Sequence, residues 1–353
     1  MTYGIKLFAV LFMSISPFDQ PPEHSAIWGK LLLEELKARG FTEAQVVGNT
    51  GIDLRRLAGD DPRLLFQDLV LLFERAADLV GDDLFGFRCG TQRESRRAGL
   101  IAYVGLSAPT ISDFLVNLGR YQRIIGDALE IDTTRLHSDG IWEWYYNVPH
   151  SVHRRQYIEF QVAGTVRSLR NWTNRKIRPE RIELRHIRSR NTADMERYLG
   201  CEIVFGSDSN RVKISKPDLT VPLITADDEL HKVLRRCCEH ALQEASRYNR
   251  SLPVDVENEI ARRLSSGMAT QKEVAQALGM SVSTLSRRLG EYGTSFSEIA
   301  LNYKRSMAKR LLKEGAMQLT EVAFLMGYQD SSAFTRAFRN WTGDPPSRYR
   351  AKH

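Results

Sequence analysis

The sequence is poor in cysteine, and its cysteines form no pattern that binds a metal. The 353 residues include four, Cys89, Cys201, Cys237 and Cys238, without a C-x-x-C pair that is matched by a second pair. Cys237 and Cys238 are adjacent in a segment expected to be helical, so their side chains point about 100° apart and do not chelate one ion together. We interpret all four as reduced thiols of a cytoplasmic protein, and we expect no metal and no cofactor.

The chain also lacks long apolar runs and phosphate-binding loops. Lys6 and the seven apolar residues Leu7–Met13 resemble a short signal peptide, but the run is much too short to span a bilayer. We interpret residues 1–25 as an N-terminal extension and expect no membrane partner. Because no G-x-G-x-x-G or Walker-type loop occurs, the sequence indicates no enzyme that binds nucleotide phosphates, and no catalytic residue is proposed.

Length and charge indicate several domains and a polyanionic partner. A chain of 353 residues is expected to form two or three domains, and 42% apolar with 26% charged residues is typical of a globular protein. The net charge is +7, and residues 254–353 hold 15 Lys and Arg against 10 Asp and Glu. This positive excess in the last hundred residues favours a polyanion such as DNA as the partner of that part.

Helix signals are frequent in the first quarter of the chain. Apolar residues at helical spacing predict a helix that Gly40 ends. The dipeptide Asp61-Pro62 predicts the N-cap and first turn of a second helix over Leu64–Val80. Thr110 and Asp113 predict a capping box at the start of a third helix. This part of the chain is therefore expected to be mainly helical.

Segments rich in β-branched and aromatic residues predict a small sheet. Ile141–Val148 is the clearest of them, and Leu129–Leu136 is expected to pair with it as a hairpin across Ser138–Gly140. The remaining predicted elements are a helix over Arg155–Trp172 and strands over Ile182–Ile187, Glu202–Phe205 and Arg211–Ile214. Together these elements predict an α+β domain with a small antiparallel sheet over residues 26–225.

Two features of this domain have both a functional and a structural interpretation. Trp142, Trp144 and Tyr146 alternate along one face of a strand, and this face either lines an effector pocket or packs under helices. The segment Arg167–Arg190 holds nine basic and two acidic residues. It forms either a solvated face or a second contact to DNA or to an anionic effector. The residues that bind an effector stay unknown from the sequence.

A helix predicted over Asp227–Ser246 connects this domain to the C-terminal part. Its apolar stripe, which begins at Leu230, is typical of a dimer seam but is too short for a coiled coil. The stretch Tyr248–Pro253 then interrupts the helix. We therefore expect a connecting helix and linker over residues 226–253, followed by a C-terminal domain over residues 254–353.

The C-terminal domain carries one motif twice. Each copy has an E-V-A triplet, then a glycine, then a triplet that ends in arginine. The copies are Glu273–Ala275, Gly279 and Leu285–Arg287, and Glu321–Ala323, Gly327 and Phe334–Arg336. A short helix, a glycine turn and a second helix with a polar face predict a helix-turn-helix. Two copies in one chain predict a protein that reads two segments of the DNA groove.

In the first unit, Ser281 is predicted to cap the second helix. Leu285 and Leu289 lie four residues apart and are expected to face the core. The side chains expected to face the major groove on the opposite side are Ser283, Ser286 and Arg287. Because arginine bonds O6 and N7 of guanine in a bidentate pair, Arg287 is expected to carry most of the base recognition of this unit.

The second unit repeats this arrangement with a richer polar face. Phe334, Phe338 and Trp341 form its expected core stripe. The groove-facing side chains are expected to be Ser331, Ser332, Arg336 and Arg339. A helix over Ser295–Lys313 joins the two units and fixes their separation. The side chains on it that are expected to contact phosphates are Arg305, Lys309 and Arg310.

With this pattern, the last hundred residues resemble the DNA-binding domain of the AraC/XylS family of transcription regulators. The segments that carry the resemblance are Glu273–Ala275, Leu285–Arg287, Thr294–Phe296, Ala308–Leu312, Glu321–Ala323, Gly327–Tyr328, Phe334–Phe338 and Gly343–Arg350. The resemblance implies an all-α domain of two helix-turn-helix units joined by a linker helix. It places the base-reading positions of the family at Ser283, Ser286, Arg287, Ser331, Ser332 and Arg336.

The N-terminal part resembles the sensing domain of regulators of ornithine and arginine catabolism in that family, through Gly99–Thr110 and Arg120–Gln122. The resemblance implies a sequence-specific regulator, activator or repressor, that binds double-stranded DNA and a small-molecule effector. A homodimer and a contact with RNA polymerase are further expectations. One alternative is a DNA-repair enzyme with a reactive cysteine fused to an AraC-like reader, although neither Cys89 nor Cys201 has suitable neighbours. The other is a DNA-binding protein with little sequence preference.

Overall fold

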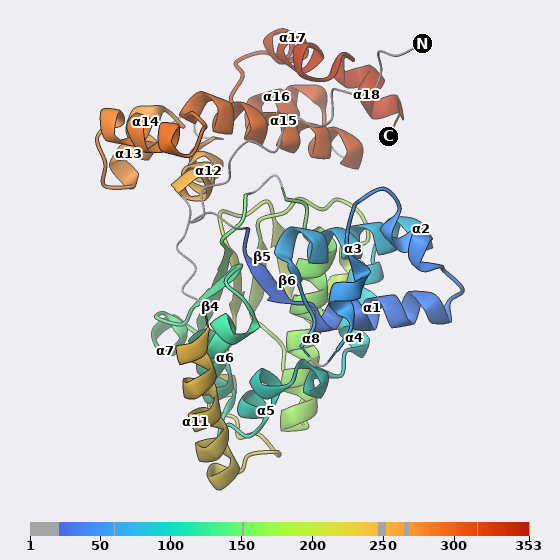
Figure 1. Cartoon of the computed structure of the whole chain (residues 1–353), viewed down its shortest axis with the longest axis vertical. Coiled ribbons are helices and arrows are strands. Elements are labelled where there is room, and N and C mark those ends of the chain that lie inside the picture. The colour runs from blue at the N-terminus through green and yellow to red at the C-terminus, as the bar shows by residue number, and fades with distance from the viewer. Residues whose placement is uncertain are drawn as a thin grey trace. The chain divides into compact units, whose positions relative to one another are not determined.

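The computed structural model describes residues 21–59, 61–149, 152–245, 252–264, 269–315 and 317–352. The predicted N-terminal extension therefore lies outside the described residues as far as residue 20, and so does the predicted boundary at residues 248–251. The chain divides into two compact units (Figure 1). The N-terminal unit comprises Pro22–Val148 and Val152–Arg247, and the C-terminal unit contains Tyr248–His353.

The core of the N-terminal unit is built around a five-stranded sheet with the strand order β3-β4-β7-β5-β6. Its strands are β3 (Leu129–Asp132), β4 (Ile141–Tyr146), β5 (Arg181–Leu184), β6 (Glu202–Phe205) and β7 (Asn210–Lys213). All neighbours pair antiparallel except β5 and β6, which are parallel. The predicted α+β class is confirmed, with one parallel pair at the edge of the sheet.

Helices cover this sheet and form the rest of the unit (Figure 1). They are α1 (Ile27–Ala38), α2 (Glu43–Val47), α3 (Phe66–Val80), α4 (Phe85–Gln92), α5 (Leu100–Leu106), α6 (Ile111–Ile125), α7 (Leu136–Asp139), α8 (Arg155–Thr173), α9 (Thr192–Leu199), α10 (Lys216–Leu219) and α11 (Asp228–Glu244), with short 3₁₀ turns at Leu54–Leu57 and Ser95–Ala98. Thr110 caps α6 by accepting a hydrogen bond from the backbone N–H of Asp113, as predicted.

The predicted helix over Leu64–Val80 begins two residues late. Arg63–Leu65 forms strand β2, which pairs with β1 (Glu23–Ser25) in a separate two-stranded sheet. The backbone N–H of Phe66 donates to the carbonyl of Pro22 at 2.9 Å, so the chain stays extended up to that residue. The prediction that Asp61-Pro62 starts the helix was wrong because pairing with a distant segment outweighs a local cap signal.

The hairpin between β3 and β4 is also shorter than predicted. The strand expected over Leu129–Leu136 ends at Asp132, whose carboxylate accepts a hydrogen bond from the backbone N–H of Thr134. The chain then turns into α7, where Leu136 is fully buried. The connection between β3 and β4 therefore contains a helical turn that buries Leu136, and the strand pairing does not continue to that residue.

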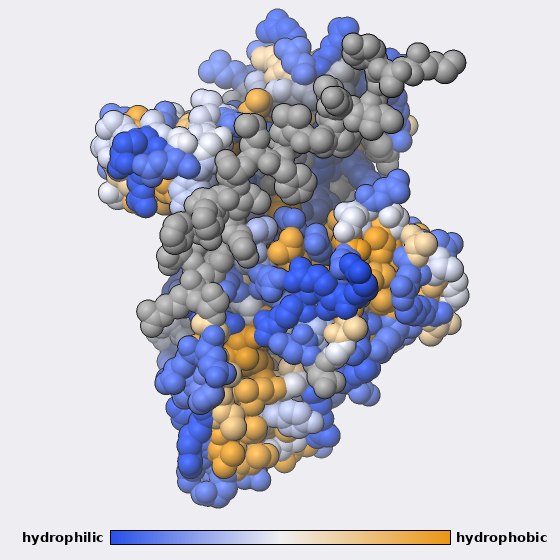
Figure 2. Space-filling view, in the orientation of Figure 1, coloured by the Kyte–Doolittle hydropathy of each residue, from blue (hydrophilic) through white to orange (hydrophobic). Residues whose placement is uncertain are grey.

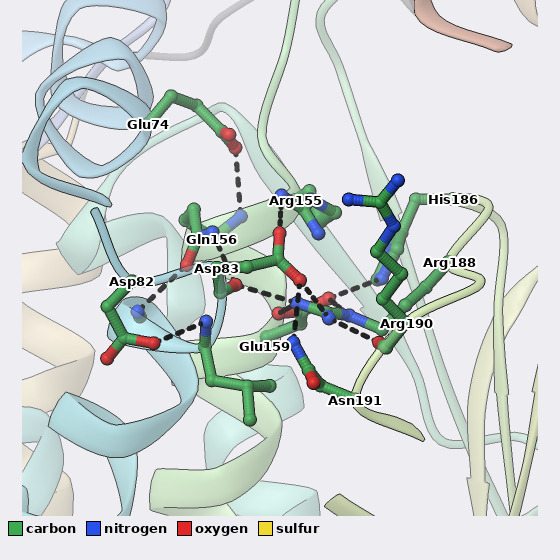
Figure 3. Close-up of polar contacts among 12 residues, drawn as sticks. Glu74, Asp82, Asp83, Arg155, Gln156, Glu159, His186, Arg188, Arg190 and Asn191 are labelled. Atoms are coloured by element: carbon green, nitrogen blue, oxygen red, sulfur yellow. Dashed lines mark hydrogen bonds and ion pairs between the residues drawn. The ribbon is translucent and has the colours of Figure 1, made fainter. Parts of the chain in front are cut away.

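A buried ion network ties the segment after β5 to α8 (Figure 3). Arg188 donates from Nε and Nη2 to the two carboxylate oxygens of Glu159 at 2.8 and 2.9 Å, and from Nη1 to Asp83 at 2.6 Å. His186 lies 3.0 Å from Glu159 through its Nε2. Arg155 donates to the other oxygen of Asp83 at 2.6 Å. Within the basic stretch Arg167–Arg190, Arg188 therefore has an internal structural role.

The C-terminal unit is entirely helical in its described residues. Its helices are α12 (Leu252–Arg263), α13 (Gln271–Ala277), α14 (Val282–Glu291), α15 (Phe296–Glu314), α16 (Leu319–Leu325), α17 (Ser331–Thr342) and α18 (Pro346–Lys352). Helix α12 is not predicted from the sequence, because proline at position 253 indicates a break. Pro253 lies instead in the first turn of the helix, where proline is tolerated. No described helix of either unit is long and apolar enough to cross a membrane.

Candidate DNA interface and effector cavity

The two helix-turn-helix units share the same turn geometry. Gly279 and Gly327 both have a positive φ, of 67° and 75°, a conformation that glycine adopts without strain. The backbone N–H of Met280 donates to the carbonyl of Ala275 at 2.8 Å, and that of Tyr328 to Ala323 at 3.0 Å. Both first helices therefore end in the same way.

The copies differ by one residue in the turn. Ser281 caps α14 by accepting from the backbone N–H of Thr284 at 3.1 Å, and Asp330 caps α17 by accepting from that of Ala333 at 2.7 Å. Counted from the equivalent glycines, the second cap comes one residue later. The extra residue is therefore accommodated between Tyr328 and Asp330, and α17 begins with a charged cap where α14 begins with serine.

The predicted groove-facing residues of the first unit lie on the exposed side of α14. Leu285 and Leu289 are fully buried on the opposite side. Ser283, Ser286 and Arg287 are exposed. Ser286 accepts a hydrogen bond of 2.8 Å from the side-chain amide of Gln271. Arg287 donates to the carboxylate of Glu291, one turn later, at 2.5 Å, a partner that its i,i+4 spacing could have revealed.

The second unit presents a less constrained cationic face on α17. Ser332, Arg336 and Arg339 are exposed, and Ser331 is half-buried at the first position of the helix. No carboxylate of the described residues forms an ion pair with Arg336, in contrast to Arg287. On the other side Phe334 and Phe338 are fully buried, with ring centroids 5.7 Å apart. A rigid aromatic core thus supports this face.

The predicted phosphate contacts lie along α15, which joins the two units. Ser295 caps this helix by accepting from the backbone N–H of Glu298 at 3.2 Å. Arg305 is exposed and donates to the side chain of Asn302, whereas Lys309 and Arg310 are half-buried. Nη2 of Arg310 lies 2.7 Å from the sulfur of Met307. Of the three, Arg305 is the most accessible to a phosphate.

The second candidate site is a cavity of about 120 Å³ between the sheet and helices α6 and α8 of the N-terminal unit. Trp142, Trp144 and Tyr146 line it from β4, and all three are buried. Both interpretations of this strand face therefore hold in part, because the face packs under helices and also encloses space. The helical wall of the cavity could not be predicted from the sequence, because it is built from segments that lie far apart in the chain.

His24 and Arg93 are two polar side chains that line this cavity. His24 lies 2.9 Å from the carbonyl of Ser25 through Nδ1, and burial lowers the pKa of its imidazole to about 4. It is therefore neutral at physiological pH. Arg93 lies with its guanidinium carbon 5.0 Å from the ring centroid of Trp28. Neither residue was singled out from the sequence.

Helix α11 packs on α5 and α6, the two helices that also contribute residues to the cavity wall. His231 and Cys238 are buried in this contact, while Leu230 and Val233 are 43% and 52% exposed. In Figure 2 the side of α11 in view is hydrophilic, with hydrophobic surface beside it. The two residues that α11 buries, His231 and Cys238, are therefore not members of the apolar stripe that begins at Leu230.

Cys89, Cys201 and Cys238 are not activated as nucleophiles. Burial raises the pKa of the thiols of Cys89, Cys201 and Cys238 to about 11, so these side chains stay protonated at neutral pH. Among the described residues, no group of three or more His, Cys, Asp or Glu side chains is placed to hold a metal ion. These observations oppose the alternative of a DNA-repair enzyme with a reactive cysteine.

Two family models match the chain. One, described as the arabinose-binding N-terminal domain of the AraC transcription regulator, matches residues 40–223. A helix-turn-helix model matches residues 274–352. The first match includes the five strands of the sheet, and the second includes the repeated turns described above.

Several known proteins are similar to the chain. The HTH-type transcriptional regulator VirS of Mycobacterium tuberculosis is 26% identical over 283 residues, which cover 80% of this chain and 82% of that protein. The ornithine utilization regulator of Pseudomonas aeruginosa is 24% identical over 334 residues, or 92% and 95% of the two chains. The crystal structure of the transcriptional regulator CdpR from Pseudomonas aeruginosa is 17% identical, with a TM-score of 0.43 over 96% of this chain and 100% of that chain.

Proposed function

The chain belongs to the AraC family of transcription regulators, and we propose that its two helix-turn-helix units read two neighbouring segments of the DNA major groove. We infer further that a small molecule in the cavity of the N-terminal unit controls this binding. The proposal places the protein in the cytoplasm, together with its DNA.

The observation that supports DNA reading is the shared division of α14 and α17 into two faces. Each helix buries apolar residues on one side and exposes Ser and Arg on the other. The proposed base-reading residues are Ser283, Ser286, Arg287, Ser331, Ser332, Arg336 and Arg339. Arg336 is the strongest candidate, because it is exposed and forms no ion pair with a carboxylate of the described residues that would have to break before it meets a guanine.

The decisive experiment compares Arg336→Ala with the unchanged protein in DNA-binding titrations on an operator selected from a random library. We expect the variant to lose about 1–3 kcal/mol of binding free energy and to discriminate less at one base position. Arg197→Ala, an exposed arginine of the N-terminal unit, serves as the control with equal loss of charge. Undiminished discrimination at every position in Arg336→Ala would remove this residue from the reading surface.

Phosphate contacts from α15 are distinguished from base contacts by their salt dependence. We propose that Arg305, Lys309 and Arg310 contact the DNA backbone. Lys309→Ala should weaken binding to all sequences alike and lower the slope of log affinity against log salt by about one unit. If Lys309→Ala instead changed the preferred sequence, the residue would belong to the reading surface.

Control by an effector is supported by the position of the cavity relative to α11. Residues of α5 and α6 line the cavity, and α11 packs on the same two helices before the chain continues to the DNA-binding unit. A ligand that shifts α5 or α6 therefore has a physical route to α11. The prediction is that a cavity ligand changes the affinity for operator DNA.

We also propose a homodimer that uses α11. The exposed Leu230 and Val233 give this helix an apolar strip outside its packed face. Val233→Glu should shift the protein toward monomer in sedimentation, and Lys232→Glu, at an exposed neighbouring position, should not.

If the protein acts as an activator, we expect a contact with RNA polymerase, which transcription with purified components would test.

A further inference from the structure

The cavity of the N-terminal unit contains a cation without a counter-ion among the described residues. Arg93 is the one described lining side chain that carries a full charge. The described residues place no carboxylate within ion-pair distance of it. Its Nη1 donates to the side-chain oxygen of Gln161, but its Nε is buried and finds no hydrogen-bond acceptor among the described residues. A buried cation without a counter-ion costs folding free energy.

Several contacts hold the guanidinium of Arg93 in place. It lies over the rings of Trp28 and Phe160, 5.0 and 5.4 Å from their centroids. Gln161 is itself oriented, because its amide donates to the hydroxyl of Tyr157 at 2.7 Å. A Cβ on Gly164 would lie 2.4 Å from Nε, so only glycine lets the guanidinium lie against α8 at this point. The cation is thus preorganised.

The charge of Arg93 persists in this environment. Burial lowers the pKa of the guanidinium to about 10, which leaves it protonated at neutral pH. The other lining group that can carry a positive charge is His24, and its imidazole is neutral at that pH because burial lowers its pKa to about 4. The cavity therefore has a net positive charge and attracts an anion.

Two more buried polar atoms of the cavity wall have no hydrogen-bond partner in the part of the chain that the structure describes. They are Nε1 of Trp142, which is a donor, and Oε1 of Gln122, which is an acceptor. Native proteins leave few buried polar atoms unpaired. The rest of the wall is mainly aromatic and aliphatic. The cavity thus combines an apolar body, one cation and two unused hydrogen-bonding atoms, which is the pattern of a ligand site.

We propose that the cavity binds a small, largely apolar monocarboxylate whose acid group pairs with Arg93. The carboxylate would supply the missing counter-ion, and the hydrocarbon part would lie against Trp142 and the other aromatic walls. A cavity of about 120 Å³ is close in size to one that accommodates benzene. The expected ligand therefore has on the order of six to ten non-hydrogen atoms. This inference rests on the proposed role of the cavity as the effector site.

The test measures binding of hexanoate and of its uncharged isostere hexanamide to the full chain, by tryptophan fluorescence and by thermal shift. Tryptophans line the cavity, so a ligand there should change their emission. We expect hexanoate to bind at least about tenfold more tightly than hexanamide, because a charge-assisted bond is lost in the amide. Across linear carboxylates of increasing length, affinity should pass through a maximum where the cavity is filled.

Arg93→Gln is the decisive variant, because it removes the cation and keeps a polar group. It should abolish the preference for hexanoate over hexanamide and leave the free protein folded, since a buried unpaired charge is removed. Arg97→Gln, at an exposed arginine paired with Glu34, should retain the preference. A preference that persists in Arg93→Gln, or equal binding of the two ligands to the unchanged protein, would overturn the proposal.

A second variant keeps the test decisive if Arg93→Gln does not fold. Trp142→Phe replaces the indole by a smaller phenyl ring that has no N–H donor, and it should weaken hexanoate binding, whereas unchanged binding would count against the site. Operator affinity is measured separately with and without hexanoate. Binding of hexanoate in the cavity with no change in operator affinity supports the ligand class but contradicts the effector role. If the unchanged protein binds none of the carboxylates, the proposed ligand class is wrong, whereas the proposal that the protein reads DNA stays intact.

Discussion

The hydroxyl of Tyr121 on α6 donates a hydrogen bond of 2.6 Å to Oε1 of Glu239 on α11. Arg120 donates to the same oxygen at 2.8 Å. The next residue of α6, Gln122, lines the cavity. Adjacent residues of α6 thus contact the cavity and the helix that precedes the DNA-binding unit, so this hydrogen bond is one described connection between the cavity wall and α11.

Replacing Tyr121 by Phe should loosen α11 without disturbing its apolar contacts. The ring of Tyr121 is fully buried, so only the hydrogen bond is lost, at a cost of about 1 kcal/mol in the local docking free energy. Hydrogen exchange of the α11 amides should accelerate accordingly. Glu239→Gln should have a similar effect, and the double variant should be little worse than either single one.

The control for this prediction is Tyr103→Phe on α5, because Tyr103 is 44% exposed and also loses only a hydroxyl. In Tyr103→Phe, the amides of α11 should exchange at the same rate as in the unchanged protein. If Tyr121→Phe left the exchange of α11 unchanged as well, the bond to Glu239 would not hold the helix.

Because Arg287 pairs with Glu291, we predict that the two reading helices contribute unequally to DNA binding. Glu291→Gln should raise affinity for all DNA sequences several-fold at low salt, because a negative charge near the phosphates disappears. It should also lower discrimination at the base read by Arg287, since the guanidinium loses the partner that orients it. Binding titrations on matched and mismatched operators measure both effects.

Glu298→Gln is the matched control, since it removes one exposed negative charge from the neighbouring helix α15. It should produce a smaller general gain and no loss of discrimination. An equal loss of discrimination in Glu298→Gln would show that charge alone, rather than the orientation of Arg287, determines the effect.

The parts of the fold set by local signals could be predicted from the sequence. Capping side chains such as Thr110 and Ser281, and glycine turns such as Gly279, act within a few residues and were placed correctly. The start of α3 could not be predicted, because it depends on pairing of Arg63–Leu65 with a strand about forty residues earlier. Local preference fails where a distant partner determines the backbone.

The same distinction applies to the candidate sites. Exposure of Arg287 and Arg336 follows from helical periodicity, which one sequence reveals. The environment of Arg93 does not, because Trp28, Gln161 and Gly164 come from different segments that meet only in the folded unit. Arg93 therefore looked like any other surface arginine in the sequence.

The buried network around Glu159 predicts a strong stability effect. Burial pushes the pKa of Glu159 upward, but hydrogen bonds from His186 and Arg188 outweigh it and hold the pKa below its usual value. Glu159→Gln leaves Arg188 without its bidentate partner and should reduce the free energy of unfolding by about 3–5 kcal/mol. Urea denaturation at neutral pH measures this loss.

Asp194→Asn is the matched control for Glu159→Gln, because it breaks the exposed pair with Arg197. It should change stability by less than about 1 kcal/mol. Since the folded-state pKa of Glu159 is depressed, its contribution is present at neutral pH and is lost as the pH falls through the folded pKa. An equally small effect of both variants would mean that the network does not stabilise the unit.

His24 predicts how stability depends on pH between about 6.5 and 4. Burial is the main cause that lowers its pKa from 6.5 to about 4, assisted by the charge of Arg63 and opposed by the bond to the carbonyl of Ser25. In this window the unfolded chain binds a proton that the folded protein excludes, so stability falls as the pH falls, by roughly 2–3 kcal/mol between pH 7 and 4.5. In His24→Gln, whose side chain is uncharged throughout, that part of the pH dependence should disappear, whereas His240→Gln at an exposed site should keep it. Urea denaturation at pH 7 and 4.5 measures the difference, and an unchanged slope in His24→Gln would show that other groups cause the acid sensitivity.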